Sequence, residues 1–291
     1  MQSWSRITEP GTIDDLVTDA GEAGYEVTAR LVHDWVAQGL LDKPTRRSKG
    51  RRGSAKALHA TNQRKLFLLL LEKRQQMPKI PSLALIPLYL WLYFGDDYVP
   101  TRQAVKALRT WLKDGMRNKR VAREAARGML QQLDHSLASD TARNRLLRLL
   151  TDVGYTGRFD QEELVEAARA VFEPASVFAG TGLVRAAGHP DVAVTVEGFL
   201  TYTEAMCTAI RRVRDGGLDT ALFDRVRLVH RRTKPDYLAR HHEYAAADSG
   251  AFAAAFAAPM LDDVVNDCGR ELLTIVGFEV LSAEGHLGHV V

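Results

Sequence analysis

A dense run of basic side chains is the part of this sequence with the clearest chemical potential. Residues 43–79 contain 12 lysines and arginines but only one acidic residue, Glu72. Seven of these basic residues follow one another without an acidic residue between them: Lys43, Arg46, Arg47, Lys49, Arg51, Arg52 and Lys56. Lysine and arginine neutralise phosphates and release the counterions condensed on nucleic acid. The segment therefore predicts a nucleic-acid partner.

The charge of the chain is unevenly divided along its length. Residues 1–148 contain 26 basic and 15 acidic residues, a net charge of +11, whereas residues 149–291 contain 13 and 21, a net charge of −8. The two halves together give the net charge of +3. A basic half joined to an acidic half predicts an anionic partner for the first half.

Other chemistries have weaker support. His241, His242 and Glu243, with His230 nearby, could suggest a metal site, but adjacent histidines project about 100° apart on a helix. We interpret them as a polar helix surface. The segment Gly180–Gly182 lacks the third glycine of a dinucleotide-binding loop. Because no Gly-x-Ser-x-Gly, His-Glu-x-x-His or paired-cysteine motif occurs, we expect no enzymatic activity, no cofactor and no metal.

The composition is that of an ordinary folded protein. Of the 291 residues, 46% are apolar and 26% are charged, which excludes wholesale disorder. The longest apolar stretch, Leu83–Phe94, contains Pro87 and is too short for the roughly 20 residues of a transmembrane helix, so it is interpreted as buried core. The N-terminus has no secretory-signal pattern, and Cys207 and Cys268 lack metal-like spacing. We therefore expect reduced core thiols in a cytoplasmic protein with no membrane partner.

Two short helices are expected before the basic run. Thr12 followed by Ile-Asp-Asp predicts a helix start, since a hydroxyl caps free N–H groups and acidic residues complement the helix dipole. This helix is expected to end at Gly21. The apolar spacing predicts a second helix from Val27 that stops at Gly39. Proline and glycine among the basic residues predict a loop or loose hairpin over Asp42–Ala57.

These helices carry the pattern of a known family. Residues Ile13–Gly21 (IDDLVTDAG) and Val27–Leu41 (VTARLVHDWVAQGLL) resemble the N-terminal DNA-binding domain of the MerR family of transcriptional regulators. In that family an Ile-x-x-Leu helix ending in Ala-Gly precedes a recognition helix that closes with Gly-Leu-Leu. The resemblance covers roughly residues 12–75, and it implies that Arg46–Ala57 is the wing and Thr61–Glu72 the following helix. It also implies a dimer that acts at promoters by distorting operator DNA.

The sequence departs from the family pattern in three places. Five extra residues, Glu22–Glu26, lengthen the turn between the two helices. His33 and Asp34 stand where members usually have arginine and tyrosine, both of which help to hold DNA. The wing is richer in arginine than usual and lacks the usual aromatic-containing end. We therefore expect backbone docking to have shifted from the recognition helix toward the wing.

The second helix and the wing supply the candidate DNA contacts. The first residues of a recognition helix reach base edges in the major groove, and the polar side of this helix presents Thr28, Arg30 and His33 there. Basic residues of the wing are expected to contact phosphates or the minor groove. The complete candidate set is Thr28, Arg30, His33, Arg46, Arg47, Lys49, Arg51, Arg52 and Lys56.

The expected fold is mainly α, with a winged helix-turn-helix at residues 1–78 and an all-helical domain at residues 79–291. The expected function is that of a DNA-binding transcriptional regulator, with double-stranded DNA as its partner and a homodimer as its assembly. The C-terminal domain would provide dimerisation and the place where an effector ligand or RNA polymerase acts. The family's long coiled-coil helix is not evident, because Gly115 and Asn118 interrupt the stretch Thr101–Leu137.

Two alternatives stay open. An excisionase-like accessory DNA-binding protein of a mobile element shares the winged motif but typically has no large acidic C-terminal domain. A helical interaction domain, or an enzyme domain, could merely carry a solvated basic arm. The salt dependence of DNA binding separates the last alternative from the others, because phosphate contacts require a steep loss of affinity with salt.

Overall fold

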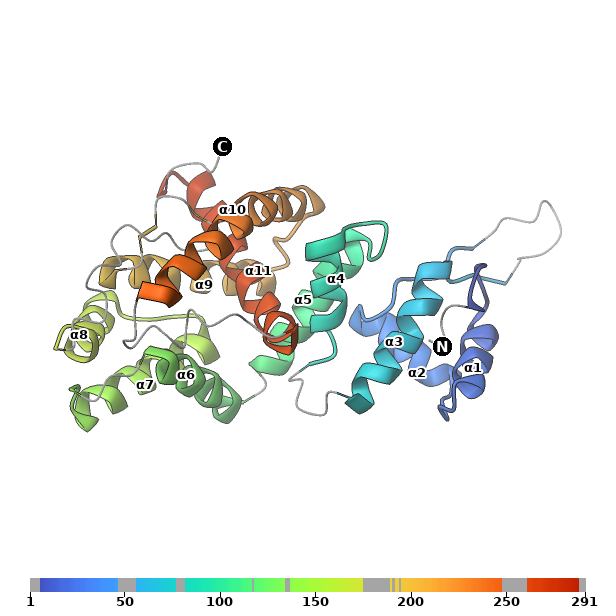
Figure 1. Cartoon of the computed structure of the whole chain (residues 1–291), viewed down its shortest axis with the longest axis horizontal. Coiled ribbons are helices and arrows are strands. Elements are labelled where there is room, and N and C mark those ends of the chain that lie inside the picture. Colours follow the sequence, from blue (N-terminus) through green and yellow to red (C-terminus); the bar gives the residue numbers. More distant parts are fainter. Residues whose placement is uncertain are drawn as a thin grey trace. The chain divides into compact units, whose positions relative to one another are not determined.

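The fold is mainly α, as predicted. The computed structural model describes residues 6–46, 56–76, 82–116, 118–133, 137–174, 189, 192–193, 195–247 and 261–287. Within these residues the chain forms eleven helices, and its β-structure is limited to isolated bridges (Figure 1). The helices belong to two compact units, residues 1–111 and 112–291.

Five helices belong to the first unit. They are α1 (Ile13–Glu22), α2 (Ala29–Gln38), α3 (Thr61–Gln76), α4 (Leu85–Phe94) and α5 (Thr101–Gly115), the last of which ends beyond the unit boundary. The unit therefore reaches past residue 78, where the sequence analysis placed the domain boundary. The difference arises because α4 and most of α5 pack together with the first three helices.

Local signals in the sequence set the ends of α1 and α2. The Thr12 hydroxyl accepts a hydrogen bond from the Asp15 N–H at 3.3 Å, and the Asp15 carboxylate accepts one from the Thr12 N–H at 2.6 Å. This reciprocal pair is a capping box, which satisfies free N–H groups at the start of α1. At the C-terminal end of α2, Gly39 adopts φ +78°, a left-handed conformation that favours glycine. Both ends confirm the sequence prediction.

The core of the first unit joins α2 to α3. Val32 and Trp35 on α2 are buried, and the Trp35 ring meets the buried Phe67 ring of α3 edge to face at 5.3 Å. Offset and edge-to-face aromatic pairs stabilise beyond their buried area. The apolar helix α4 adds Trp91, which is fully buried, to the same unit. The interpretation of Leu83–Phe94 as core is confirmed for most of its length, although Phe94 is 51% exposed.

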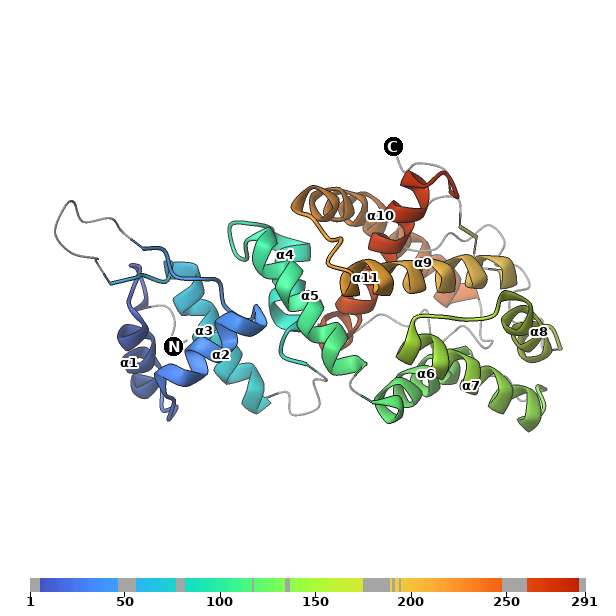
Figure 2. The same cartoon turned by 180° about the vertical axis from the view of Figure 1, so that it is seen from behind.

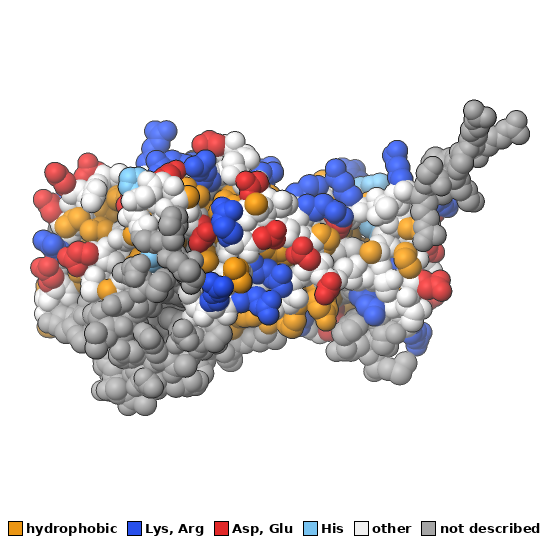
Figure 3. Space-filling view, turned by 90° about the horizontal axis from the view of Figure 1, so that it is seen from above, with side chains coloured by type: hydrophobic (Ala, Val, Ile, Leu, Met, Phe, Trp, Pro, Cys, Tyr) orange, Lys and Arg blue, Asp and Glu red, His pale blue; other side chains and the backbone are white. Residues whose placement is uncertain are grey.

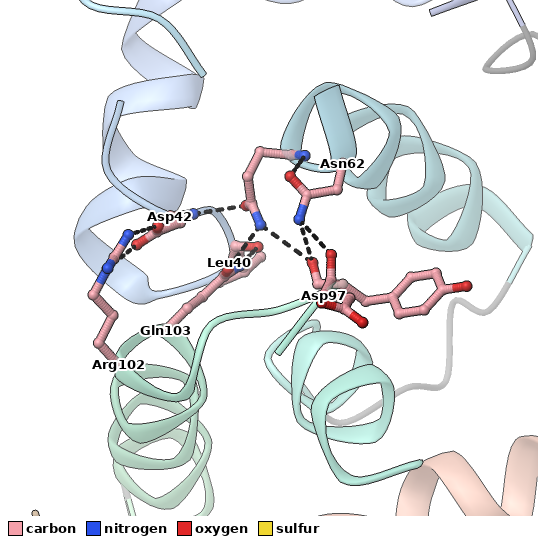
Figure 4. Close-up of polar contacts among 8 residues, drawn as sticks. Leu40, Asp42, Asn62, Asp97, Arg102 and Gln103 are labelled. Carbon is pink, nitrogen blue, oxygen red and sulfur yellow. Dashed lines mark hydrogen bonds and ion pairs between the residues drawn. The ribbon is translucent and has the colours of Figure 1, made fainter. Parts of the chain in front are cut away.

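Neutral amide side chains tie α5 to the segments around α2 and α3 (Figure 4). Gln63 of α3 accepts a hydrogen bond from the Asp42 N–H at 2.8 Å and donates one to the Gln103 side chain of α5 at 2.9 Å. Gln103 in turn donates to the Leu40 carbonyl at 2.8 Å. Both glutamines are buried, and a buried amide is costly unless it is hydrogen-bonded. The network therefore fixes one arrangement of these elements.

Two further contacts hold α5 in place. The Arg102 Nε donates to the Asp42 carboxylate at 3.0 Å, directly beside the amide network (Figure 4). The Thr110 hydroxyl donates to the carbonyl of Gln38, the last residue of α2, at 2.7 Å. The C-terminal end of α2 therefore lies against α5.

In its described residues the second unit contains six complete helices, which Figure 2 shows from behind. They are α6 (Lys119–Leu133), α7 (Asp140–Thr156), α8 (Gln161–Phe172), α9 (Val196–Arg214), α10 (Thr220–Ala247) and α11 (Leu261–Ala283). Because α5 ends at Gly115 and α6 begins at Lys119, no single helix spans residues 101–137, as predicted. Buried residues of α7 and α8, among them Leu146, Leu164 and Phe172, form an apolar core with the start of α9.

Helices α9 and α11 approach each other closely in this unit. A Cβ atom added to Gly277 of α11 would lie 1.9 Å from the Ala205 carbonyl oxygen of α9. The two cysteines lie on these helices and are buried and unbridged, as their spacing predicts. Burial raises the pKa of the Cys207 thiol to about 12 and also raises the pKa of Cys268, so both are protonated at neutral pH.

A buried ionic group joins α10 to α11. The Glu271 carboxylate of α11 lies 3.0 Å from Lys234 Nζ and 3.4 Å from His230 Nε2, both on α10. Burial works against the charged carboxylate, but the His230 hydrogen bond and the Lys234 charge lower the pKa of Glu271 overall. His230 therefore has a structural place in this unit.

No helix in the described part of the chain combines the length and apolar character needed to cross a membrane.

Candidate nucleic-acid interface

Helix α2 presents one polar face to solvent while its apolar face is held in the core. The Arg30 side chain is 90% exposed, and His33 on the next turn is also exposed. Arg30 Nε lies 4.0 Å from the Asp34 carboxylate, and an exposed pair of this kind is worth less than about 1 kcal/mol. The guanidinium is therefore available to an external partner.

The turn before α2 lies slightly later than the sequence predicts, because α1 continues one residue past Gly21 and α2 begins two residues after Val27. Residues 23–28 separate α1 from α2, and Gly24 adopts φ +87° within the turn. Thr28 precedes the first residue of α2, is exposed, and makes no capping hydrogen bond with its side chain. Its hydroxyl, like the Arg30 guanidinium, is therefore accessible at the N-terminal end of α2.

Backbone pairing forms the base of a hairpin beside these helices. The N–H of Thr45 donates to the carbonyl of Leu58 at 2.8 Å, and the reverse bond is 3.0 Å long. Gly11, before α1, pairs in the same antiparallel manner with His59. Three separate segments thus meet at one point of the first unit.

The structure describes two of the six basic candidates in this hairpin. Arg46 is exposed beside the paired Thr45. Lys56 is also exposed, and its Nζ lies 3.0 Å from the Asp14 carboxylate of α1. Because this ion pair is open to solvent, it holds Lys56 only weakly. The four other candidates lie outside the described residues: Arg47, Lys49, Arg51 and Arg52.

His59 lies at the hairpin base and is structural. Its side chain is 2% exposed. Burial lowers the pKa of His59, because desolvation disfavours the charged imidazolium. The ring is therefore neutral at neutral pH and adds no positive charge to the basic segment.

Arg64 belongs to the basic run of the sequence, yet it holds the first unit together. Its Nε and one Nη each donate to the Asp19 carboxylate at 2.9 Å, and the other Nη donates to the Glu9 carbonyl at 2.8 Å. Both charged side chains are 14% exposed, so the pair fastens α3 to α1. Arg64 precedes the buried Leu68 and Leu71 at helical spacing, which was the signal that it faces inward.

The described residues provide no geometric support for a metal site or a dinucleotide-binding loop. In the described part of the chain, no group of three His, Cys, Asp or Glu side chains is placed to hold a metal ion. Gly180–Gly182 and the side chains of His241, His242 and Glu243 lie outside the description.

Comparisons with known proteins add no relative. No family model, no curated protein and no solved structure matches the chain.

Proposed function

We propose that this chain is a DNA-binding transcriptional regulator with a winged helix-turn-helix, similar to that of the MerR family. In this proposal α2 is the recognition helix and the hairpin closed by Thr45 and Leu58 is the wing. The observation that carries the proposal is the exposed polar face of α2, where Arg30 and His33 face solvent beside the base of a basic hairpin. An α-helix fits the major groove of B-DNA, and wing cations can reach the flanking phosphates.

We expect α2 and the wing to contact different parts of the DNA. Thr28, Arg30 and His33 would meet base edges, because the N-terminal residues of a recognition helix enter the groove. Arg46 and Lys56, with the four basic residues between them, would meet phosphates or the minor groove. Lys56 would exchange its weak pair with Asp14 for a phosphate.

The second unit would serve assembly and regulation. The half of the chain from residue 149 onward has a net charge of −8, which makes it a poor surface for DNA. We propose that it supports a homodimer, and that an effector ligand or RNA polymerase acts there. A dimer that binds two half-sites at once would bind DNA more tightly than one protomer does. The second half-site binds at a high effective concentration once the first is bound, so each protomer needs no additional contact.

Replacing Arg30 with alanine tests whether α2 reads sequence. A preferred site would first be enriched from a pool of random duplexes. If the Arg30 guanidinium donates two hydrogen bonds to guanine, Arg30→Ala should weaken binding to that site by about 1–3 kcal/mol. The same variant should weaken binding to random DNA much less. The measurement is the dissociation constant of each variant on both duplexes.

Arg51→Ala is the comparison variant for this experiment. As a wing cation it should weaken both duplexes alike and reduce the salt slope by about one unit. Equal losses on both duplexes for Arg30→Ala would show that α2 is not the recognition helix.

A further inference from the structure

Helix α5 carries a stripe of basic side chains along one face. Arg102, Lys106 and Arg109 recur at intervals of four and three residues, which places them on the same side of a helix. The other side of α5 is buried and includes Ala104 and Leu108. Arg102 and Arg109 are exposed and Lys106 is half-buried, so the basic stripe faces solvent.

The stripe lies next to the exposed face of α2. The Thr110 hydroxyl of α5 donates to the carbonyl of Gln38 at the end of α2. Gly39 packs so closely on α5 that an added Cβ would lie 2.5 Å from the Lys106 Cβ. Because Gln38 is itself exposed, the polar face of α2 continues directly onto Lys106.

Most of the charge on this stripe is not used inside the protein. Arg102 pairs with Asp42, but in the part of the chain that the structure describes neither Lys106 nor Arg109 has an ion-pair partner. In the space-filling view, several Lys and Arg side chains lie together on the surface of the part of the molecule that contains the first unit (Figure 3). The charged ends of Lys106 and Arg109 therefore form no ion pair within the described part of the chain, although the Lys106 stem packs near Gly39.

We propose that Lys106 and Arg109 of α5 bind the phosphate backbone of duplex DNA beside the groove that receives α2. The inference rests on the proposed function. A helix inserted in the major groove is flanked by the phosphates of both strands, and duplex DNA carries one negative charge per roughly 1.7 Å of its axis. The solvent-facing cations that continue the surface of α2 are complementary to that charge. The DNA-binding unit then includes α5 and not only the helix-turn-helix and wing.

The test compares two double variants of the full chain on a random-sequence duplex of about 30 base pairs. Lys106→Gln/Arg109→Gln removes two charges from the stripe and keeps the side-chain stems that pack near Gly39. Arg123→Gln/Arg127→Gln removes the same two charges from exposed positions on α6 in the second unit. Thermal unfolding of each variant first establishes that its fold is intact.

For the α5 variant we expect a loss of affinity on the order of tenfold at 0.1 M salt, and a salt slope that is smaller by about two units. The α6 control should keep the affinity and slope of the parent chain. The single variant Arg109→Gln, at an exposed position, should lower the slope by about one unit. This variant tests the proposed phosphate contact of Arg109 and leaves the packing of Lys106 near Gly39 unchanged.

An unchanged slope in the α5 variant would overturn the inference, and so would equal losses in the α5 and α6 variants. Either result leaves the proposed function standing if the parent chain binds DNA with a steep salt dependence. If the parent chain does not bind the duplex at all, both the proposed function and this inference fail. The two failures are therefore distinguishable.

Discussion

Gly39→Ala is expected to destabilise the first unit by about 2–4 kcal/mol. Gly39 ends α2 at φ +78°, a conformation that costs a non-glycine residue about 1 kcal/mol. Its Cβ would also lie 2.5 Å from the Lys106 Cβ and 2.7 Å from the Ala107 backbone nitrogen, and overpacking of this kind costs about 1–3 kcal/mol. Because the obstacle includes the backbone of α5, no side-chain rotation relieves it. The free energy of unfolding in urea measures the effect.

Gly24→Ala is the matched control for this prediction. Gly24 adopts φ +87°, but an added Cβ would meet no atom within 4 Å. The same substitution should therefore cost only the conformational part, about 1 kcal/mol. If the two variants lost equal stability, α2 and α5 would not be in the close contact described above.

Gly277→Ala is expected to destabilise the second unit by about 3 kcal/mol. An added Cβ would lie 1.9 Å from the Ala205 carbonyl oxygen and 2.7 Å from the Ala205 Cα, so α9 and α11 would have to separate. Cys207 on α9 and Cys268 on α11 are buried and unbridged, so separation of these helices should expose them. Urea unfolding and the rate of thiol labelling should both register the change.

Gly128→Ala supplies the control of opposite sign. Gly128 lies inside α6, and an added Cβ would meet nothing within 4 Å. Alanine favours the helix over glycine by up to about 1 kcal/mol, so this variant should be neutral or more stable than the parent chain. Stabilisation by both substitutions would contradict the close packing of α9 on α11.

The start of α1 and the end of α2 could be predicted because their signals are local. Thr12 and Asp15 form the capping box within one helical turn, and Gly39 is the single residue whose backbone conformation stops α2. Such signals need no knowledge of the rest of the chain. Among the candidate contacts, Thr28, Arg30 and His33 are exposed at the start of α2, as their polar positions in the helical pattern suggested.

The extent of the first unit could not be predicted in the same way. It depends on hydrogen bonds from Gln63 to Gln103 and from Gln103 to the Leu40 backbone carbonyl. The partners in these bonds are 40 and 63 residues apart in the sequence. Neutral amides are common on surfaces, so nothing in the local sequence distinguishes a buried glutamine from an exposed one. A boundary at residue 78 was inferred from proline and from the end of the basic run, which carry no information about this long-range network.

Charge density alone does not separate basic residues that hold the unit together from basic residues that face solvent. The paired Arg64 and Asp19 side chains are only 14% exposed, whereas beyond the dense run Arg109 is exposed and Lys106 half-buried next to α2. Helical spacing relative to buried apolar residues separates the two cases. Arg64 shares the face of Leu68 and Leu71, and Lys106 shares the face of Arg102 and Arg109.

The salt dependence of DNA binding decides whether this chain binds duplex DNA through phosphate contacts. The affinity of the full chain for a random-sequence duplex of about 30 base pairs would be measured between about 50 and 200 mM salt. The logarithm of the binding constant should fall linearly with the logarithm of the salt concentration, with a slope of about −0.9 for each phosphate contacted. With contacts from the wing and α5, the total slope should be steeper than about −4. Binding that is absent at 50 mM salt, or whose slope is near zero, would contradict the account.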